Sequence, residues 1–355
     1  MSATPEGNRR YSLQEIADHV GGQVVGDPQQ QIDGLGSLQT AQASQITHLS
    51  SPAYKQYLPE TAAAAVILNE KDAAECPCAA VVVAQPYLAF AIVSQLFAKS
   101  RPGHGSVDPS ASVHPSVAVP KTAYIGPNVV IGADTQLADD VWLQANITVG
   151  ERCRLDRGVV VYGNVTLYAD VKIGAESVVH SGAVIGADGF GFTHDGDGKL
   201  QGIAQLGGVQ IGSHVSVGAN TTIDCGAIED TVIEDGVKID NLVQIGHNCH
   251  IGAHSLICGK VGLVGSTRIG RHCVLAGGVG VGGDKPIELC DGVIASATTH
   301  ITQSITEPGV YSGSSMYQPH NLWRRNVLRL PQLDELFKRV RKLEKTVSRG
   351  GNDQS

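Results

Sequence analysis

The chain has 355 residues, and its 26 Lys+Arg against 34 Asp+Glu give a net charge of -8. This acidic balance argues against a nucleic-acid partner, and no window offers the ~20 uncharged apolar residues of a membrane span. The first twenty residues lack an apolar signal core, so we expect a soluble cytoplasmic protein.

Residues 1–100 are predicted to form a small α/β domain. Ser12-Leu-Gln-Glu15 resembles a capping box that opens a helix through Val20. Strand-like runs cover residues 64–68 and 80–83, and a second helix is expected over 87–98. The stretch 100–105 contains Pro and Gly and marks a linker, to which we assign residues 101–110.

A six-residue repeat dominates the rest of the chain. Ile, Leu or Val stands at every sixth position from Val113 to Ile185, and again from Ile233 to Val281. Neither a helix of 3.6-residue period nor a strand of period 2 produces this pattern, which is typical of a parallel β-helix. We therefore expect a left-handed parallel β-helix over residues 111–315, with three hexads per triangular turn. Gly, Asn and Asp follow the aliphatic residues, and they tolerate the backbone angles of sharp corners.

The repeat is interrupted once. After Ile185 comes a glycine-rich run to Phe192 and a polar stretch, 194–199. The repeat resumes at Ile211 two residues out of phase, and the original phase returns by Ile233. A regular coil gains nothing from such an excursion, so this projecting loop is a candidate binding element.

Residues 316–355 are predicted to be a helical extension. Its helix, over residues 321–349, should be broken or bent at Pro331. Apolar residues recur at 3/4 spacing, and basic residues crowd the other face. A single apolar stripe needs a partner, so we expect self-association as a homotrimer.

The eight cysteines form no close-spaced framework. Cys153, Cys249 and Cys273 each follow a core aliphatic by four residues, a position held elsewhere by Val, Thr or Ser, so we expect them to be small buried side chains. Cys76 and Cys78 flank Pro77, a spacing with no zinc or redox signature.

His247 is the first catalytic candidate. It occupies a corner position that holds Ala133 or Glu151 in other hexads, where an imidazole faces outward and could accept a proton near neutral pH. The alternative is a solvated corner histidine. A metal shared with His250 and His254 is disfavoured, because these residues lie on different corners, and no metal ligand is assigned.

Several motifs then carry a resemblance to a known family. They are Gly186-Ala-Asp-Gly-Phe-Gly191, Thr221-Thr-Ile-Asp-Cys-Gly226, Ile239-Asp-Asn-Leu-Val-Gln-Ile-Gly-His-Asn248, Gly259-Lys-Val-Gly262 and Ile305-Thr-Glu-Pro-Gly-Val-Tyr311. In this order they resemble UDP-3-O-(3-hydroxyacyl)glucosamine N-acyltransferase of lipid A synthesis, over nearly the whole chain. The resemblance implies a cofactor-independent enzyme that transfers a 3-hydroxyacyl group from acyl carrier protein to the 2-amino group of a UDP-sugar.

The resemblance also assigns roles to residues. It makes His247 the general base, suggests that Asp240 supports the imidazole, and places an oxyanion donor at the backbone N–H near Gly265. Sugar contacts would come from Asp188, Phe190 and Gly191 of the excursion. The uridine pocket of the N-terminal domain corresponds to residues 46–54, with His48 and the aromatic surface of Tyr54.

The chain departs from the family pattern at several positions. His48, Ser51 and Ala53 replace an F-x-x-N-x-K pattern before Tyr54, and Cys225 replaces an arginine. A second family histidine is missing from residues 283–286, where Lys285 could supply a positive charge for a phosphate. Gln303 stands where an arginine is common, and His300 lies in the region that limits acyl length.

Two further questions stay open at this point. Arg324 and Arg325 could meet an acidic acyl carrier protein, or they could belong to a solvated helix face. The rival functions are an O-acyltransferase acting on UDP-N-acetylglucosamine, which would be shorter and lack the N-terminal domain, and a diverged non-catalytic paralogue that binds a nucleotide sugar or acyl carrier protein.

Overall fold

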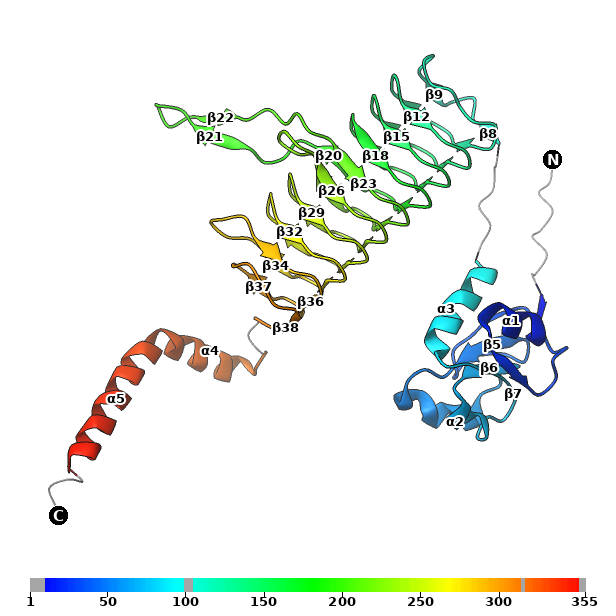
Figure 1. Cartoon of the computed structure of the whole chain (residues 1–355), viewed down its shortest axis with the longest axis horizontal. Coiled ribbons are helices and arrows are strands. Elements are labelled where there is room, and N and C mark those ends of the chain that lie inside the picture. Colours follow the sequence, from blue (N-terminus) through cyan, green and yellow to red (C-terminus); the bar gives the residue numbers. More distant parts are fainter. Residues whose placement is uncertain (1–9, 99–104, 314–316, 351–355) are drawn as a thin grey trace. The chain divides into compact units, whose positions relative to one another are not determined.

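The computed structural model describes residues 10–98, 105–313 and 317–350, the last five by their backbone alone. The chain divides into two compact units, residues 1–102 and residues 103–355 (Figure 1). Each unit has its own hydrophobic core. The stretch 100–105 that sequence assigns to the linker lies, apart from Gly105, outside the described residues.

The N-terminal unit is an α/β domain built on one five-stranded sheet of order β2-β7-β6-β5-β4. Its strands are β2 (Gln23–Val25), β4 (Gly34–Leu35), β5 (Gln45–His48), β6 (Ala65–Leu68) and β7 (Ala79–Val82). Only β2 runs antiparallel to its neighbour. A separate antiparallel pair joins β1 (Tyr11–Ser12) to β3 (Gln31–Ile32).

Helices cover both faces of this sheet. The predicted capping box exists: the Ser12 hydroxyl accepts from the Glu15 N–H at 3.2 Å, and the Glu15 carboxylate accepts from the Ser12 N–H at 2.7 Å. It begins α1 (Leu13–Val20), which packs with α3 (Pro86–Leu96) against one core. The second core includes Leu58 of the 3-10 helix η1 (Pro52–Glu60), and α2 (Glu70–Ala73) follows β6.

The second unit is a parallel β-helix with three flat faces, as the hexads predict. Face 1 comprises β8 (Ser106–Val107), β10 (Tyr124–Ile125), β13 (Trp142–Leu143), β16 (Val160–Val161), β19 (Val178–Val179), β24 (Ser216–Val217), β27 (Lys238–Ile239), β30 (Leu256–Ile257), β33 (Val274–Leu275), β36 (Val293–Ala295) and β38 (Gly309–Tyr311). Face 2 comprises β9 (Ser112–Val113), β11 (Val130–Ile131), β14 (Thr148–Val149), β17 (Thr166–Leu167), β20 (Val184–Ala187), β25 (Thr222–Asp224), β28 (Gln244–Ile245), β31 (Gly262–Leu263), β34 (Gly280–Val281) and β37 (His300–Ile301). Face 3 comprises β12 (Gln136–Leu137), β15 (Arg154–Leu155), β18 (Val171–Ile173), β23 (Val209–Ile211), β26 (Thr231–Ile233), β29 (His250–Ile251), β32 (Arg268–Ile269) and β35 (Glu288–Leu289).

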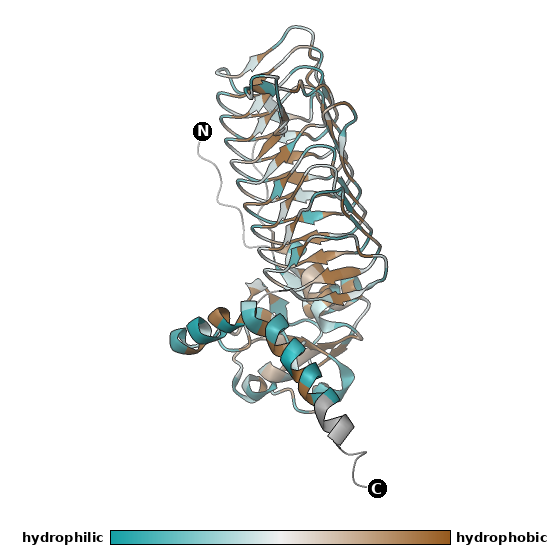
Figure 2. Cartoon of the chain, turned by 90° about the vertical axis from the view of Figure 1, so that its left-hand side faces the viewer, coloured by the Kyte–Doolittle hydropathy of each residue, from teal (hydrophilic) through white to brown (hydrophobic). Residues whose placement is uncertain are grey.

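The repeating aliphatic residue is the core of this coil. Each one points inward and stacks on its equivalent in the next turn, as Ile125 does on Leu143 in the strand register. Figure 2 shows the hydrophobic positions recurring up the coil. A fully buried aliphatic side chain contributes about 1.5–3 kcal/mol relative to an exposed one, so the series supplies much of the stability. The coil begins at β8, inside the range 101–110 that sequence assigns to the linker, because Ser106–Val107 already pairs with β10.

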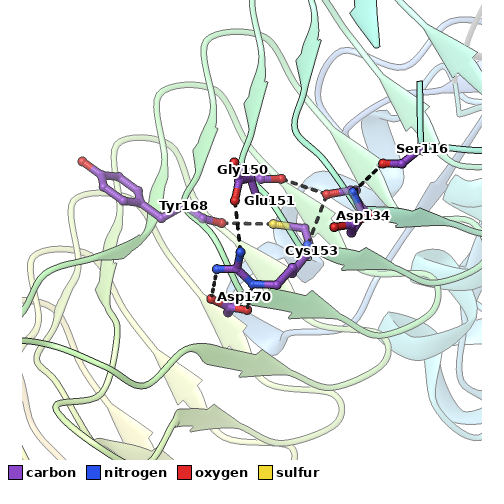
Figure 3. Close-up of polar contacts among 9 residues, drawn as sticks. Ser116, Asp134, Gly150, Glu151, Cys153, Tyr168 and Asp170 are labelled. Atoms are coloured by element: carbon purple, nitrogen blue, oxygen red, sulfur yellow. Dashed lines mark hydrogen bonds and ion pairs between the residues drawn. The ribbon is translucent and has the colours of Figure 1, made fainter. Parts of the chain in front are cut away.

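The corners between faces are closed by a repeated set of polar contacts (Figure 3). Asp134, Arg152 and Asp170 hold the left-handed conformation, with φ of 59°, 55° and 62°, at the same corner of successive turns. The residue after each is small and buried. Thr135 donates its hydroxyl to the Gly150 carbonyl at 2.8 Å, and the Cys153 thiol donates to the Tyr168 carbonyl at 3.0 Å.

The buried cysteines follow this rule, as predicted. Cys153, Cys249 and Cys273 are each at most 1% exposed. Their thiols donate to a corner carbonyl, that of Val264 in the case of Cys249 at 3.3 Å. Burial raises the pKa of the Cys249 thiol to about 11, so this group stays protonated at neutral pH.

The tail is helical and bends at Pro331, as predicted. It consists of α4 (His320–Arg329), a 3-10 turn η2 (Leu330–Gln332) and α5 (Leu333–Gly350). The apolar stripe is exposed in the single chain and includes Leu333, Leu336, Phe337, Val340 and Leu343. Val347 belongs to the predicted stripe, but its side chain is outside the described residues. Over the described ranges, the helices are all too short or too polar to cross a membrane.

We expect Glu234 on face 3 to make coil stability depend on pH. It accepts from His250 Nε2 at 2.8 Å and from the Ala253 N–H at 2.9 Å, and these contacts, with Arg271 nearby, lower its carboxyl pKa. A lowered folded-state pKa gives stability that is present above the unfolded pKa and lost as pH falls through the folded one. Glu234→Gln should therefore lower the free energy of unfolding at neutral pH by at most about 1 kcal/mol, and the difference in Tm should narrow as the pH falls below the ordinary carboxyl pKa.

Thermal melts of wild type and Glu234→Gln from pH 7 to pH 3 measure this effect. Glu288→Gln is the control, because that carboxylate is exposed and lies 3.8 Å from Arg268. A difference in Tm between wild type and Glu234→Gln that stays constant with pH would contradict the assignment.

Candidate active site

Over residues 105–313 the coil has three interruptions, where the hexad repeat indicated a single one, and all three lie on the edge where face 2 passes into face 3; we call it the 2–3 edge. The first is the excursion between β20 and β23, which forms the hairpin of β21 (Phe192–His194) and β22 (Leu200–Gly202) that projects from the coil in Figure 1. The second is residues 225–230 between β25 and β26, and the third is residues 282–287 between β34 and β35. The second explains why the sequence returns to phase at Ile233.

His247 lies on this same edge, between the second and third interruptions. It follows β28 and precedes Asn248, which has φ of 58°. The backbone therefore repeats the ordinary corner of Figure 3, in which Ala133 and Glu151 precede the left-handed residue. What differs is the side chain, a half-buried imidazole in place of a methyl or carboxylate.

Asn248 fixes the protonation of the His247 ring. The Asn248 Nδ2 donates to the Glu229 carbonyl at 2.8 Å, which determines the orientation of the amide. The Asn248 Oδ1 then accepts from the Ala227 N–H at 3.0 Å and lies 2.9 Å from His247 Nδ1. Because an amide oxygen only accepts, Nδ1 must carry the proton, and the lone pair of the neutral ring is on Nε2. The sequence gives no role to Asn248, although it adjoins the candidate base.

Two glycines enclose the Nε2 side of the ring. A Cβ on Gly265 would lie 2.5 Å from His247 Nε2, and a Cβ on Gly189 would lie 2.7 Å from His247 Cβ and 3.0 Å from Cδ2. Gly265 is one turn further along the coil, whereas Gly189 belongs to the excursion. The structure thus brings together His247 and the two segments that sequence analysis linked to it. The Gly265 N–H makes no hydrogen bond within the described part of the chain.

Asp224 is the carboxylate that interacts electrostatically with His247 in this chain. Burial raises the pKa of Asp224, while a hydrogen bond from Gln244 Nε2 at 3.0 Å and the charge of His247 oppose that rise. Asp224 lies in the Thr221–Gly226 motif, but sequence reasoning gave it no role.

Asp240, which sequence analysis expected to support the imidazole, lies on another edge. It follows β27 at the passage from face 1 to face 2, and its Oδ1 accepts from the Asn241 N–H at 2.7 Å. The single chain therefore does not bring Asp240 to the ring. Its carboxylate is exposed in the single chain.

The predicted sugar residues lie on the excursion. Asp188 and Phe190 flank Gly189, and Phe190 is 87% exposed with its ring edge-on to Phe192 at 5.0 Å. Gly191 donates its N–H to the Gly189 carbonyl at 2.9 Å, which closes a tight turn over the imidazole. Lys285 is in the third interruption and exposed to solvent.

Glycine occupies successive turns of the coil in two columns near His247, and we call this surface the glycine floor. Below Gln244 on the outer side of face 2 come Gly262 and Gly280, and then His300, whose imidazole lies 3.6 Å from a Cβ built on Gly280. Below His247 on the 2–3 edge come Gly265 and Gly283, and then Gln303. A Cβ on Gly262 would meet open space. Both columns are therefore bare for two turns and end at the residues predicted to limit acyl length.

The predicted uridine stretch leaves β5 and enters η1. His48 stacks on Phe90 at 4.0 Å and is tilted against Tyr87, and burial lowers its pKa. Tyr54 is 56% exposed beside Tyr57. A cavity of about 330 Å³ opens between η1 and α2, and it is lined by Leu49, Ser50, Ser51, Pro52, Lys55, Asn69, Lys71 and Asp72. The buried Asn69 Oδ1 in this cavity has no hydrogen-bond partner within residues 10–98, 105–313 and 317–350.

The remaining histidines and basic residues are placed as follows. His250 pairs with Glu234, and His254 stacks on His272 at 5.3 Å, so neither faces His247. Across the described ranges, His, Cys, Asp and Glu form no group of three placed to hold a metal. Arg324 and Arg325 are exposed on α4.

Comparison with known proteins gives three findings. Residues 29–96 match the family model of UDP-3-O-(3-hydroxymyristoyl) glucosamine N-acyltransferase (LpxD), and residues 230–265 match that of bacterial transferase hexapeptide repeats. The UDP-3-O-acylglucosamine N-acyltransferases of Coxiella burnetii and Pseudomonas aeruginosa are 42% and 44% identical, over 95% of this chain and 98% and 95% of theirs. The structure of an Arabidopsis UDP-N-acetylglucosamine acyltransferase shares the fold, with a TM-score of 0.53, 20% identity, and coverage of 64% of this chain and 80% of that one.

We expect Asn248 to control the tautomer of His247. Wild-type protein should show the Nδ1-protonated form of the neutral ring, because Asn248 Oδ1 accepts from Nδ1. Asn248→Ala removes that acceptor, so the Nε2-protonated tautomer, which is usual for free imidazole, should gain population. Long-range nitrogen–proton NMR correlations of labelled histidine measure this change, and a His247→Asn variant identifies the signal. An unchanged tautomer in Asn248→Ala would contradict the assignment.

Proposed function

Because this chain belongs to the family of UDP-3-O-acylglucosamine N-acyltransferases, we propose that His247 is the base with which it acylates a UDP-linked amino sugar in lipid A biosynthesis. The acyl donor is a 3-hydroxyacyl thioester of acyl carrier protein, and the acceptor is the 2-amino group of UDP-3-O-(3-hydroxyacyl)glucosamine. The observation that carries the proposal is the imidazole with its free Nε2 on the 2–3 edge, under the excursion and above a glycine floor.

The reaction needs one proton to move. The amine nitrogen attacks the thioester carbon, and the new C–N bond would leave a cationic nitrogen that reverts to reactants unless it loses a proton. His247 Nε2 takes that proton as the bond forms. The C–S bond then breaks, and the imidazolium returns the proton to the departing thiolate, so the products are an amide and free carrier-protein thiol.

Two groups support this step. The Gly265 N–H, one turn beyond His247 and free of partners in the described chain, can donate to the oxyanion that forms at the thioester carbonyl. Asp224 stabilises the imidazolium through its negative charge. Asp240, on a different edge, would act on the substrate or on a neighbouring chain, and its role stays a prediction.

The glycine floor is a path for the acyl chain. Successive turns lie about 4.8 Å apart, so three turns from His247 to Gln303 span about 14 Å. Gly262 and Gly280 leave that length without side chains, and His300 closes its end. We propose that His300 and Gln303 set the limit of acyl length.

The partners follow from the exposed surfaces. Tyr54, His48 and the neighbouring polar cavity are proposed to hold the uridine end of the substrate, and Lys285 to meet a phosphate. Asp188, Phe190 and Gly191 would contact the sugar. The exposed apolar stripe of α5 supports a homotrimer, and Arg324 with Arg325 supports docking of the acidic carrier protein. We place the enzyme in the cytoplasm, where the carrier protein is made.

Removal of the base should abolish most of the activity. His247→Ala should lower kcat/KM by roughly 10²–10⁴-fold, which is the usual contribution of a general base. The assay uses UDP-3-O-(3-hydroxyacyl)glucosamine with a 3-hydroxyacyl carrier protein and measures amide formation. His272→Asn is the matched control, because it changes a corner histidine that stacks on His254 and keeps a residue that tolerates the left-handed backbone.

Two results would overturn this assignment. Amide formation at near wild-type rate in His247→Ala would remove the mechanism. Wild-type protein that binds the UDP-sugar but shows no turnover with any acyl donor would favour the non-catalytic paralogue.

A side chain on the glycine floor should shorten the preferred acyl group. Gly280→Met places a side chain in the proposed acyl path beside His300, since a Cβ there already lies 3.6 Å from that imidazole. We expect kcat/KM for the longest accepted donor to fall by at least about tenfold, while a donor several carbons shorter keeps most of its rate, because a buried clash costs about 1–3 kcal/mol. Competition assays between carrier-protein donors of different length measure this. Gly196→Met, at the open hairpin tip, is the control, and an unaltered length profile in Gly280→Met would contradict the proposed path.

A further inference from the structure

Gln205, on the returning arm of the excursion, has an unsatisfied amide beside the base. Its Nε2 donates to the Ile203 carbonyl at 3.0 Å, so the amide orientation is determined. Its Oε1 is buried and has no hydrogen-bond partner within the described residues. An amide oxygen left without a donor costs about 1–3 kcal/mol, so its retention in the loop requires an explanation.

The position of the Gln205 oxygen supplies this explanation. A Cβ on Gly189 would lie 2.8 Å from Gln205 Oε1, 2.7 Å from His247 Cβ and 3.0 Å from His247 Cδ2. Gln205 Oε1 and the Cδ2 edge of the imidazole are therefore both next to the position that a Gly189 side chain would occupy. A Cβ on Gly191 would lie 2.9 Å from Gln205 Nε2, so the amide is laid across the Gly189–Gly191 turn.

The returning arm is bonded to the covering turn on one side of the amide and to the coil on the other. Ile203 donates its N–H to the Gly191 carbonyl at 2.9 Å, and Leu206 donates its N–H to the Ala227 carbonyl at 2.8 Å. Gly207 adds a bond to the Gly226 carbonyl at 2.9 Å. Gln205 is consequently held on the backbone of the 2–3 edge, whereas the covering turn has no side chain at Gly189 or at Gly191.

We propose that Gln205 Oε1 accepts a hydrogen bond from the 2-amino group of the sugar and directs the lone pair of that amine toward the thioester carbon. A neutral amine has two hydrogens and one lone pair. His247 Nε2 receives the hydrogen that is lost, and Gln205 holds the one that stays on the amide product. The entering sugar displaces the glycine turn and supplies the donor that the oxygen lacks. This inference rests on the proposed function.

The test compares Gln205→Met, which keeps the length of the side chain but has no oxygen, with Gln205→Glu, which keeps an acceptor. Gln201→Met is the matched control, because Gln201 is an exposed glutamine of β22 on the same excursion. Calorimetry measures Kd for UDP-3-O-(3-hydroxyacyl)glucosamine and for its 2-deoxy analogue, which lacks the amine. Kinetics measure KM for each substrate, kcat and the pH profile.

We expect Gln205→Met to weaken binding of the amino sugar, and to lower kcat/KM for it, by roughly tenfold, the loss of one hydrogen bond. Wild type and Gln205→Met should bind the 2-deoxy analogue equally, and Gln205→Glu should recover most of the difference. The KM for the carrier protein and the pH profile should stay at wild-type values. Gln201→Met should behave as wild type.

Two outcomes would overturn the inference. The first is an equal Kd for the amino sugar in wild type and Gln205→Met. The second is an equal loss for the amino and 2-deoxy compounds, which would make Gln205 a structural part of the loop. Because the binding measurements need no turnover, a wild-type protein without transferase activity would refute the proposed function and still decide the role of Gln205.

Discussion

The coil has room inside for one aliphatic side chain per strand, and this steric limit determines where chemistry can occur. Every turn must place its inward residue against the same position of the next turn, so the strands cannot change length or register independently. Extra residues can enter only where one face passes into another. In this chain all three insertions enter at the 2–3 edge. The reacting groups therefore gather along a line parallel to the coil axis.

The proposed active site is an ordinary corner that has been altered at a few positions. The backbone at His247 and Asn248 matches that at Glu151 and Arg152, and the thiol of Cys249 bonds to the next turn as that of Cys153 does. Rigid neighbouring turns thus hold the imidazole without any special framework. We propose that its chemistry comes from three kinds of neighbour: the Asn248 amide that fixes the tautomer, the Asp224 carboxylate whose charge interacts with that of the ring, and the glycines beside Nε2.

The sequence predicts the scaffold better than the contacts within the site. The hexads predict the coil, and the capping box, the strand runs and Pro331 mark the other elements, because each depends on neighbours in the chain. His247 could be selected as a candidate because its corner position and its motif are local. The proximity of Asp224 and Gln205 to His247 could not be predicted, since it depends on how many residues the insertions add between the strands. Asp240 is near His247 in sequence, yet one hexad carries it to a different edge of the coil, so its support of the imidazole stays a prediction.

The hairpin of β21 and β22 contributes no residue to the core of the coil. Its loss, extension or exchange would therefore leave the packing of every turn unchanged, whereas a one-residue deletion within a strand would disturb all the turns that follow. Evolution can accordingly vary substrate recognition in this enzyme separately from its fold and its base. The hairpin can therefore be exchanged between related coils without disturbing the fold, and such a graft is a practical route to new acceptor specificity.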